Sequence, residues 1–131
     1  MKQELRNKDS GTPIERYKKS FFHAIDGIIY ALKNEHNMII IVLATLVVVS
    51  LGFMLKINEI EWLICVLIIS MIAATELINT SIEAAVDLET LKTHPLAKIA
   101  KDCASSATLI LVIASIIIGL VIFIPKILLY L

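Results

Sequence analysis

Three long runs of uncharged, mostly apolar residues restrict the folds that this chain can adopt more than any other feature does. They cover residues 38–55, 62–75 and 103–125, and they are 18, 14 and 23 residues long. A helix needs about 20 apolar residues to cross a bilayer, so the first and third runs are long enough. The second run reaches that length only if its helix continues into the polar residues after position 75. The sequence therefore predicts an all-α integral membrane protein with transmembrane helices at about 38–55, 60–88 and 98–125.

The segment before the first run predicts a different kind of helix, at about 12–34. Thr12-Pro13-Ile14-Glu15 combines a hydroxyl N-cap, a proline at the first helical position and a glutamate three residues after the cap. Apolar residues then recur at three- and four-residue spacing, with basic residues on the other side. We expect this amphipathic helix to lie along the lipid headgroups. Residues 1–11 should be a mobile segment, and residues 12–131 a single membrane-embedded domain.

The distribution of positive charge predicts the orientation in the membrane. Of the twelve lysine and arginine residues, seven precede the first run and three lie between the second and third runs. Only Lys56 and Lys126 lie on the other side. Because cytoplasmic segments carry the excess of positive charge, the N-terminus and the second connection should face the cytoplasm. We expect a multi-pass protein of the cell membrane.

Polar residues follow the second run in a regular pattern. Asn79, Glu83 and Asp87 fall within about 60° of the direction of Glu76 on a helix with 100° per residue. Together with Glu76 they share one side of the helix. We call this set the acidic face. Ionisable groups at membrane depth are costly and usually mark a functional site. The acidic face should lie at the cytoplasmic interface, where nucleotides are available.

Three uses of the acidic face remain open from the residues alone. The first is an ion path, although its charges cluster at one interface. The second is structural pairing with lysines, although three acids exceed what one ion pair needs. The third is phosphoryl transfer, with Mg²⁺ held by carboxylates and a lysine directed at phosphate oxygens. The chain has only four glycines and no glycine-rich nucleotide loop, so side chains would have to hold the ATP phosphates.

The acidic-face segment resembles the prokaryotic diacylglycerol kinase family. The similarity rests on the sequence ELINTSIEAAVD at 76–87, on His94-Pro-Leu-Ala-Lys-Ile-Ala-Lys101-Asp102, and on the small residues that follow. It extends over roughly residues 14–126. The resemblance implies a homotrimer with active sites shared between protomers. It also implies that Mg-ATP phosphorylates a membrane lipid alcohol, and it gives no reason to expect a nucleic acid partner.

The resemblance further implies a role for each matching residue. Glu76 would be the general base on the lipid hydroxyl and Asn79 would support it. Glu35 and Glu83 would hold the Mg²⁺ that bridges the ATP phosphates, and Ser105 would contact the lipid. The other residues around the nucleotide would be Arg16, Asp87, Lys92, Thr93, His94, Lys101 and Asp102.

The substrate is predicted from a narrower similarity. The sequence HPLAK at 94–98 and the C-terminal residues 118–126 resemble the Gram-positive branch of the family, whose members are largely undecaprenol kinases. Conversion of undecaprenol to undecaprenyl phosphate is therefore the main expectation. Diacylglycerol is the alternative acceptor, with phosphatidic acid as product. The rival from another class is a non-catalytic membrane assembly protein or an ion-conducting oligomer.

Overall fold

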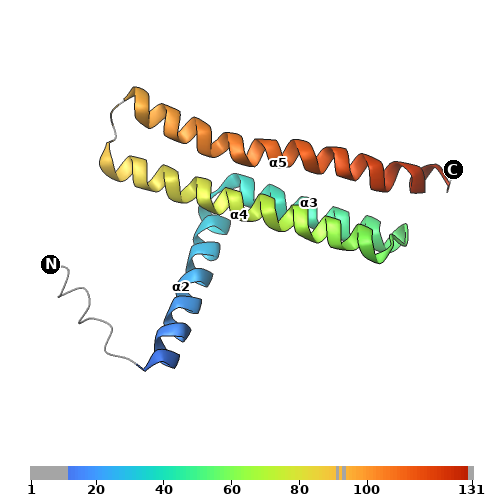
Figure 1. Cartoon of the computed structure of the whole chain (residues 1–131), viewed down its shortest axis with the longest axis horizontal. Coiled ribbons are helices and arrows are strands. Elements are labelled where there is room, and N and C mark those ends of the chain that lie inside the picture. Colours follow the sequence, from blue (N-terminus) through green and yellow to red (C-terminus); the bar gives the residue numbers. More distant parts are fainter. Residues whose placement is uncertain (1–11, 91, 93, 130–131) are drawn as a thin grey trace.

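Four helices make up most of the described chain, which comprises residues 12–90, 92 and 94–129 of the computed structural model. They are α2 (Pro13–Asn34), α3 (His36–Met54), α4 (Glu59–Glu89) and α5 (Pro95–Leu128). Helices α3, α4 and α5 run side by side, whereas α2 projects steeply away from them (Figure 1). The N-terminal segment expected to be mobile, residues 1–11, lies outside the described residues.

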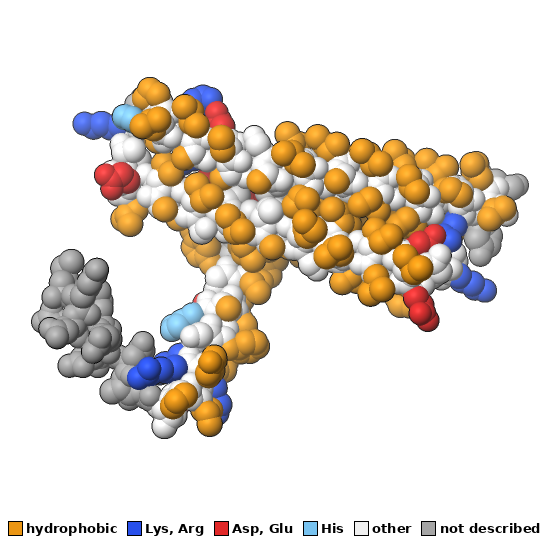
Figure 2. Space-filling view, viewed as in Figure 1, with side chains coloured by type: hydrophobic (Ala, Val, Ile, Leu, Met, Phe, Trp, Pro, Cys, Tyr) orange, Lys and Arg blue, Asp and Glu red, His pale blue; other side chains and the backbone are white. Residues whose placement is uncertain are grey.

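Helices α3, α4 and α5 are long and apolar enough to cross a membrane, which identifies a multi-pass membrane protein. Hydrophobic side chains cover the length of this bundle, and charged side chains gather at its ends and on α2 (Figure 2). Helix α4 has 31 residues and is therefore about 46 Å long, compared with about 30 Å for the hydrocarbon core. The helix thus continues well past the apolar run and carries the whole acidic face.

Two capping boxes fix the starts of α2 and α4. Before α2, the Thr12 backbone N–H donates to Glu15 Oε2 at 2.9 Å, and Glu15 N–H donates to Thr12 Oγ1 at 3.4 Å. Before α4, Asn58 and Glu61 exchange the same pair of bonds at 2.7 and 3.0 Å. Each box satisfies backbone N–H groups that have no partner within the helix.

Helix α5 is longer than the span expected at about 98–125, and a proline lies near each of its ends. Pro95 is the first residue of α5, with His94 as the N-cap. A proline fits there because the first helical N–H has no acceptor in the helix. At the other end, α5 continues through Pro125 to Leu128. Transmembrane helices tolerate an internal proline when neighbouring groups satisfy the released carbonyl.

The end of the bundle farthest from the acidic face is tightly packed, and we call it the closed end. Its core contains buried Ile57, Cys65, Ile122 and Phe123, with half-buried Trp62 against them. The Trp62 ring lies so close to Gly52 that a Cβ on Gly52 would be 2.6 Å from it. Across the bundle, Lys126 Nζ pairs with Glu61 Oε2 at 3.0 Å and joins α5 to α4. These contacts hold the three helices together at the end opposite the acidic face.

Candidate active site

The acidic face passes from buried to exposed along α4. Glu76 is only 2% exposed and Asn79 is 6% exposed, whereas Glu83 is half-buried and Asp87 is exposed. At 1.5 Å per residue, Glu83 lies about 10 Å and Asp87 about 16 Å from Glu76 along the helix axis. The apolar end of the site therefore offers a buried carboxylate, and the polar end offers accessible carboxylates.

Two oxygen atoms of the acidic face are buried without a hydrogen-bond partner. They are Glu76 Oε1 and Asn79 Oδ1, although Asn79 Nδ2 donates to Glu83 Oε1 at 3.0 Å. Leaving a buried polar atom unpaired costs about 1–3 kcal/mol, so native structures contain few such atoms. Two unpaired acceptors on one helix face indicate a place where a ligand supplies the missing partner.

A cavity of about 690 Å³ lies between the C-terminal part of α4 and the N-terminal part of α5. We call it the polar cavity. Five residues expected around a nucleotide line it: Asp87, Lys92, His94, Lys101 and Asp102. The other lining residues are Val86, Thr90, Pro95, Ala97 and Lys98. The fold thus brings together most of the nucleotide residues inferred from the sequence.

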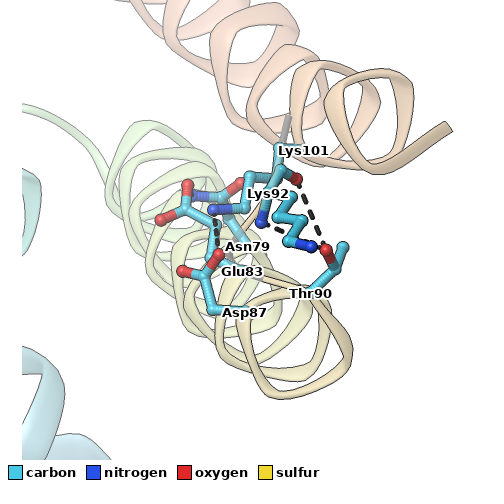
Figure 3. Close-up of polar contacts among 6 residues, drawn as sticks. All are labelled: Asn79, Glu83, Asp87, Thr90, Lys92 and Lys101. Atoms are coloured by element: carbon cyan, nitrogen blue, oxygen red, sulfur yellow. Dashed lines mark hydrogen bonds and ion pairs between the residues drawn. The ribbon is translucent and has the colours of Figure 1, made fainter. Parts of the chain in front are cut away.

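The side chains of the polar cavity form bonds across it and along its rim. Lys101 Nζ on α5 reaches Asp87 Oδ1 on α4 at 2.6 Å, beside Asn79 and Glu83 (Figure 3). Lys98 pairs with Asp102 one turn away. The Lys92 backbone N–H donates to Thr90 Oγ1 at 3.1 Å and fixes the connection. Three lysines face two aspartates, so the cavity has a positive excess that suits an anion.

A second cavity of about 240 Å³ lies deeper in the bundle, between α3, α4 and α5, and we call it the inner cavity. It places Glu76 together with Ser105, the residue expected to contact the lipid. The other lining residues are Asn37, Ile40, Ile41, Ile72, Thr108, Leu109 and Val112. Four of the isoleucine and valine residues also line a third cavity of about 200 Å³, which is almost wholly apolar. The inner cavity thus shares part of its wall with an apolar space between the three spans.

Four of the expected site residues that the structure describes line none of these cavities. Asn79 and Glu83 lie on the acidic face between the polar and inner cavities, and the other two are Arg16 and Glu35. Arg16 lies near the start of α2, about 27 Å along the axis from the end of that helix and remote from the bundle (Figure 1). Glu35 is half-buried at the junction of α2 and α3, between buried Ala31 and Met38. Thr93 lies outside the described residues. Over residues 12–90, 92 and 94–129, no cluster of three histidine, cysteine or acidic side chains could hold a metal.

The sequence-based site omitted four polar residues that line the cavities: Thr90 and Lys98 in the polar cavity, and Asn37 and Thr108 in the inner cavity. A helical-face analysis of α5 could have found Thr108, because Lys101, Ser105 and Thr108 follow at four- and three-residue spacing. Lys98 lies three residues before Lys101 on the same side. The same periodicity that identified the acidic face was therefore present, more weakly, on the facing helix.

Comparison with known proteins identifies the family of this chain. A sequence model described as prokaryotic diacylglycerol kinase matches residues 22–123. The chain is 43% identical over 122 residues to the undecaprenol kinase of Bacillus subtilis, covering 93% of this chain and 99% of the relative. It is 41% identical over 96 residues to a diacylglycerol kinase of Helicobacter pylori, covering 73% and 75%. A diacylglycerol kinase of Synechocystis is 34% identical over 110 residues, covering 83% of this chain and 63% of the relative. The chain therefore belongs to the prokaryotic diacylglycerol kinase family, and by that membership it is a membrane lipid kinase that uses ATP.

Proposed function

We propose that this protein transfers the γ-phosphoryl group of ATP to the hydroxyl of undecaprenol and so forms undecaprenyl phosphate. One observation carries the proposal. Two cavities of different character share helices α4 and α5, with α3 also lining the inner one. The acidic face runs along α4 from Glu76 in the inner cavity to Asp87 in the polar cavity. The polar cavity suits a nucleotide, and the inner cavity suits an alcohol attached to an apolar chain. The similarity to the Bacillus subtilis undecaprenol kinase extends over nearly the whole of both chains and favours undecaprenol.

Glu76 is the general base of the proposed reaction. A lipid alcohol is a weak acid, so a positioned carboxylate must accept its proton as the oxygen attacks phosphorus. Glu76 Oε1 is buried and unpaired, and Glu76 lines the inner cavity, which shares part of its wall with the apolar space. Asn79 lies one turn further along the same face and keeps Glu83 in place through its 3.0 Å bond. The new bond joins the lipid oxygen to the γ-phosphorus, and ADP leaves.

The polar cavity binds the nucleotide in this proposal. Lys101 and Lys98 are close enough to the cavity to contact phosphate oxygens, and Asp87 orients Lys101 through the 2.6 Å ion pair. His94 and Lys92 line the side of the cavity formed by the connection, where the adenosine would lie. Arg16, Thr93 and Asp102 remain proposed nucleotide contacts. Proximity and electrostatic stabilisation of the phosphates can supply most of the rate enhancement in phosphoryl transfer.

The side chains near Glu83 fit a magnesium ion. Mg²⁺ binds protein sites through one or two carboxylates and completes its shell with water and substrate phosphates, so a cluster of three acids is not required. Glu83 and Glu35 would hold it, and the unpaired Asn79 Oδ1, on the side chain that bonds Glu83, would be a further hard oxygen ligand. When bound, Mg²⁺ neutralises the charge on the phosphates.

The remaining architecture is proposed as follows. Helix α2 lies along the membrane surface, because Tyr17, Phe21 and Phe22 on it are exposed beside basic residues. The N-terminus and the polar cavity face the cytoplasm, as the distribution of lysine and arginine predicts. The active protein is a homotrimer with shared sites. Arg16 lies too far from the polar cavity of its own protomer, so it would reach the nucleotide of a neighbouring one.

The test uses purified protein with labelled ATP, Mg²⁺ and either undecaprenol or diacylglycerol in mixed micelles. We expect phosphorylation of undecaprenol at the higher kcat/KM, and we expect Glu76→Gln to reduce kcat about 10²- to 10⁴-fold, the usual contribution of a general base. Near wild-type turnover of Glu76→Gln would remove Glu76 as the base. Preferential phosphorylation of diacylglycerol would reassign the substrate. Absence of lipid-dependent ATP consumption would favour the non-catalytic alternative.

A further inference from the structure

The hydroxyl of Thr108 is unusual among the hydroxyls of the spans. Eight serine and threonine side chains in α3, α4 and α5 donate to a carbonyl of their own helix three or four residues earlier, as Thr45 Oγ1 does to Ile41 O at 2.7 Å. Such bonds satisfy the hydroxyl where no water is available. Thr108 Oγ1 is buried and has no partner at all. Within the described residues it is the only hydroxyl in this state.

The position of Thr108 indicates what its hydroxyl is for. Thr108 lines the inner cavity from α5, and Glu76 lines the same cavity from α4 with its own unpaired Oε1. One atom belongs to a carboxylate that can only accept, and the other belongs to a hydroxyl that can donate. Glu76 Oε1 and Thr108 Oγ1 do not hydrogen-bond each other, so each is available to a group that enters the cavity between them. An alcohol can donate its proton to one partner and accept from the other at the same time.

We propose that Thr108 orients the acceptor alcohol by donating a hydrogen bond to its oxygen, while the alcohol donates to Glu76 Oε1. This inference rests on the proposed function and adds a substrate-binding residue to it. The two bonds use the alcohol proton and one lone pair of the oxygen. The remaining lone pair is then directed toward the polar cavity, where the γ-phosphorus arrives. The bond to phosphorus forms with that pair, the proton passes to Glu76, and the bond from phosphorus to the bridging oxygen of ADP breaks.

This arrangement also accounts for a hydroxyl that would otherwise be unfavourable. A buried donor without a partner costs about 1–3 kcal/mol, and a valine of the same shape would avoid that cost. In the absence of lipid, Thr108→Val should therefore unfold at the same temperature as the wild type or higher. The substitution should harm only the state in which the alcohol is bound. A residue that serves packing alone would behave in the opposite way.

The experiment compares Thr108→Val with Thr108→Ser in steady-state assays that vary undecaprenol and ATP separately. One hydrogen bond between neutral groups contributes about 0.5–1.5 kcal/mol, so Thr108→Val should lower kcat/KM for undecaprenol about 3- to 10-fold. The KM for ATP should not change, and Thr108→Ser should recover most of the loss. Thr75→Val is the matched control, because the Thr75 hydroxyl bonds its own helix and lines none of these cavities. It should keep the wild-type kcat/KM.

A binding measurement separates this inference from the proposed function. Thermal unfolding is measured with undecaprenol and with the matching hydrocarbon that lacks the hydroxyl. Wild type should gain more stability from the alcohol than from the hydrocarbon, and Thr108→Val should lose that difference. If wild type shows no phosphorylation but keeps the difference, the proposed function fails and the Thr108 contact stands. If Thr108→Val matches the wild type in both kcat/KM and alcohol-specific stabilisation, the inference is overturned.

Discussion

The ion pair between Lys101 and Asp87 allows a direct test of whether Lys101 acts on ATP or only stabilises the fold. In Lys101→Met the charge is lost and the length of the side chain is roughly kept. The two side chains are 36% and 49% exposed, and the atoms are 2.6 Å apart. Ion pairs of this exposure contribute about 0–1 kcal/mol to stability, so unfolding of Lys101→Met should change little. If the pair only stabilises the fold, Lys101→Met should therefore have a small effect on both stability and activity.

The catalytic purpose predicts a large effect on ATP use. A hydrogen bond from a charged donor contributes about 1.5–3 kcal/mol, and 1.4 kcal/mol corresponds to a factor of ten. If Lys101 contacts a phosphate, Lys101→Met should lower kcat/KM for ATP about 10- to 150-fold. The assay measures ADP release at saturating undecaprenol over a range of ATP concentrations, together with thermal unfolding of the same preparations.

Lys126→Met is the matched control at the closed end. Lys126 also pairs with a carboxylate on α4, Glu61, at 3.0 Å, and its pair is more buried, at 24% and 20% exposure. We expect Lys126→Met to lose more stability than Lys101→Met and to keep the wild-type kcat/KM for ATP. The reasoning would be refuted if Lys101→Met kept its activity, or if both variants lost stability and activity in proportion.

Two further predictions concern the metal and the packing. Glu83→Gln should raise the Mg²⁺ concentration needed for half-maximal activity and leave the KM for lipid unchanged; an unaltered Mg²⁺ titration would remove Glu83 from the metal site. Gly52→Ala should destabilise the protein by about 1–3 kcal/mol in a thermal unfolding measurement, because the added Cβ would lie 2.6 Å from the Trp62 ring. Gly119→Ala is the control, since a Cβ there meets nothing within 4 Å, and it should be neutral or stabilising.

The helices and the acidic face could be predicted from the sequence because both depend on local periodicity. Apolar length identifies a span, and the 100° step between residues places Glu76, Asn79, Glu83 and Asp87 on one side. Helix α5 begins at Pro95, three residues before the expected start at about 98, and a proline is compatible both with a break and with a first helical turn. Only the conformation of the connection, with His94 as the N-cap, distinguishes the two.

Arg16 and Glu35 are two proposed site residues that lie apart from the cavities of their own chain. Both were inferred from the family resemblance, and no cavity described here contains either of them. In the proposed homotrimer, their roles would depend on how α2 packs on neighbouring protomers. Helix periodicity carries no information about that packing, since it describes each helix alone.

The sequence by itself determined three spans, a polar end on the second span, and the chemical type of the residues gathered there. The tertiary structure decided which side chains of α5 face them. It joins Asp87 to Lys101, and it places Thr108 in the same cavity as Glu76. The physical reason is that helical periodicity fixes which residues share a face, whereas the rotation of one helix against another depends on packing. Here the rotation of α5 against α4 is set in part at the closed end, where Lys126 pairs with Glu61 and where Ile122 and Phe123 share a core with Cys65.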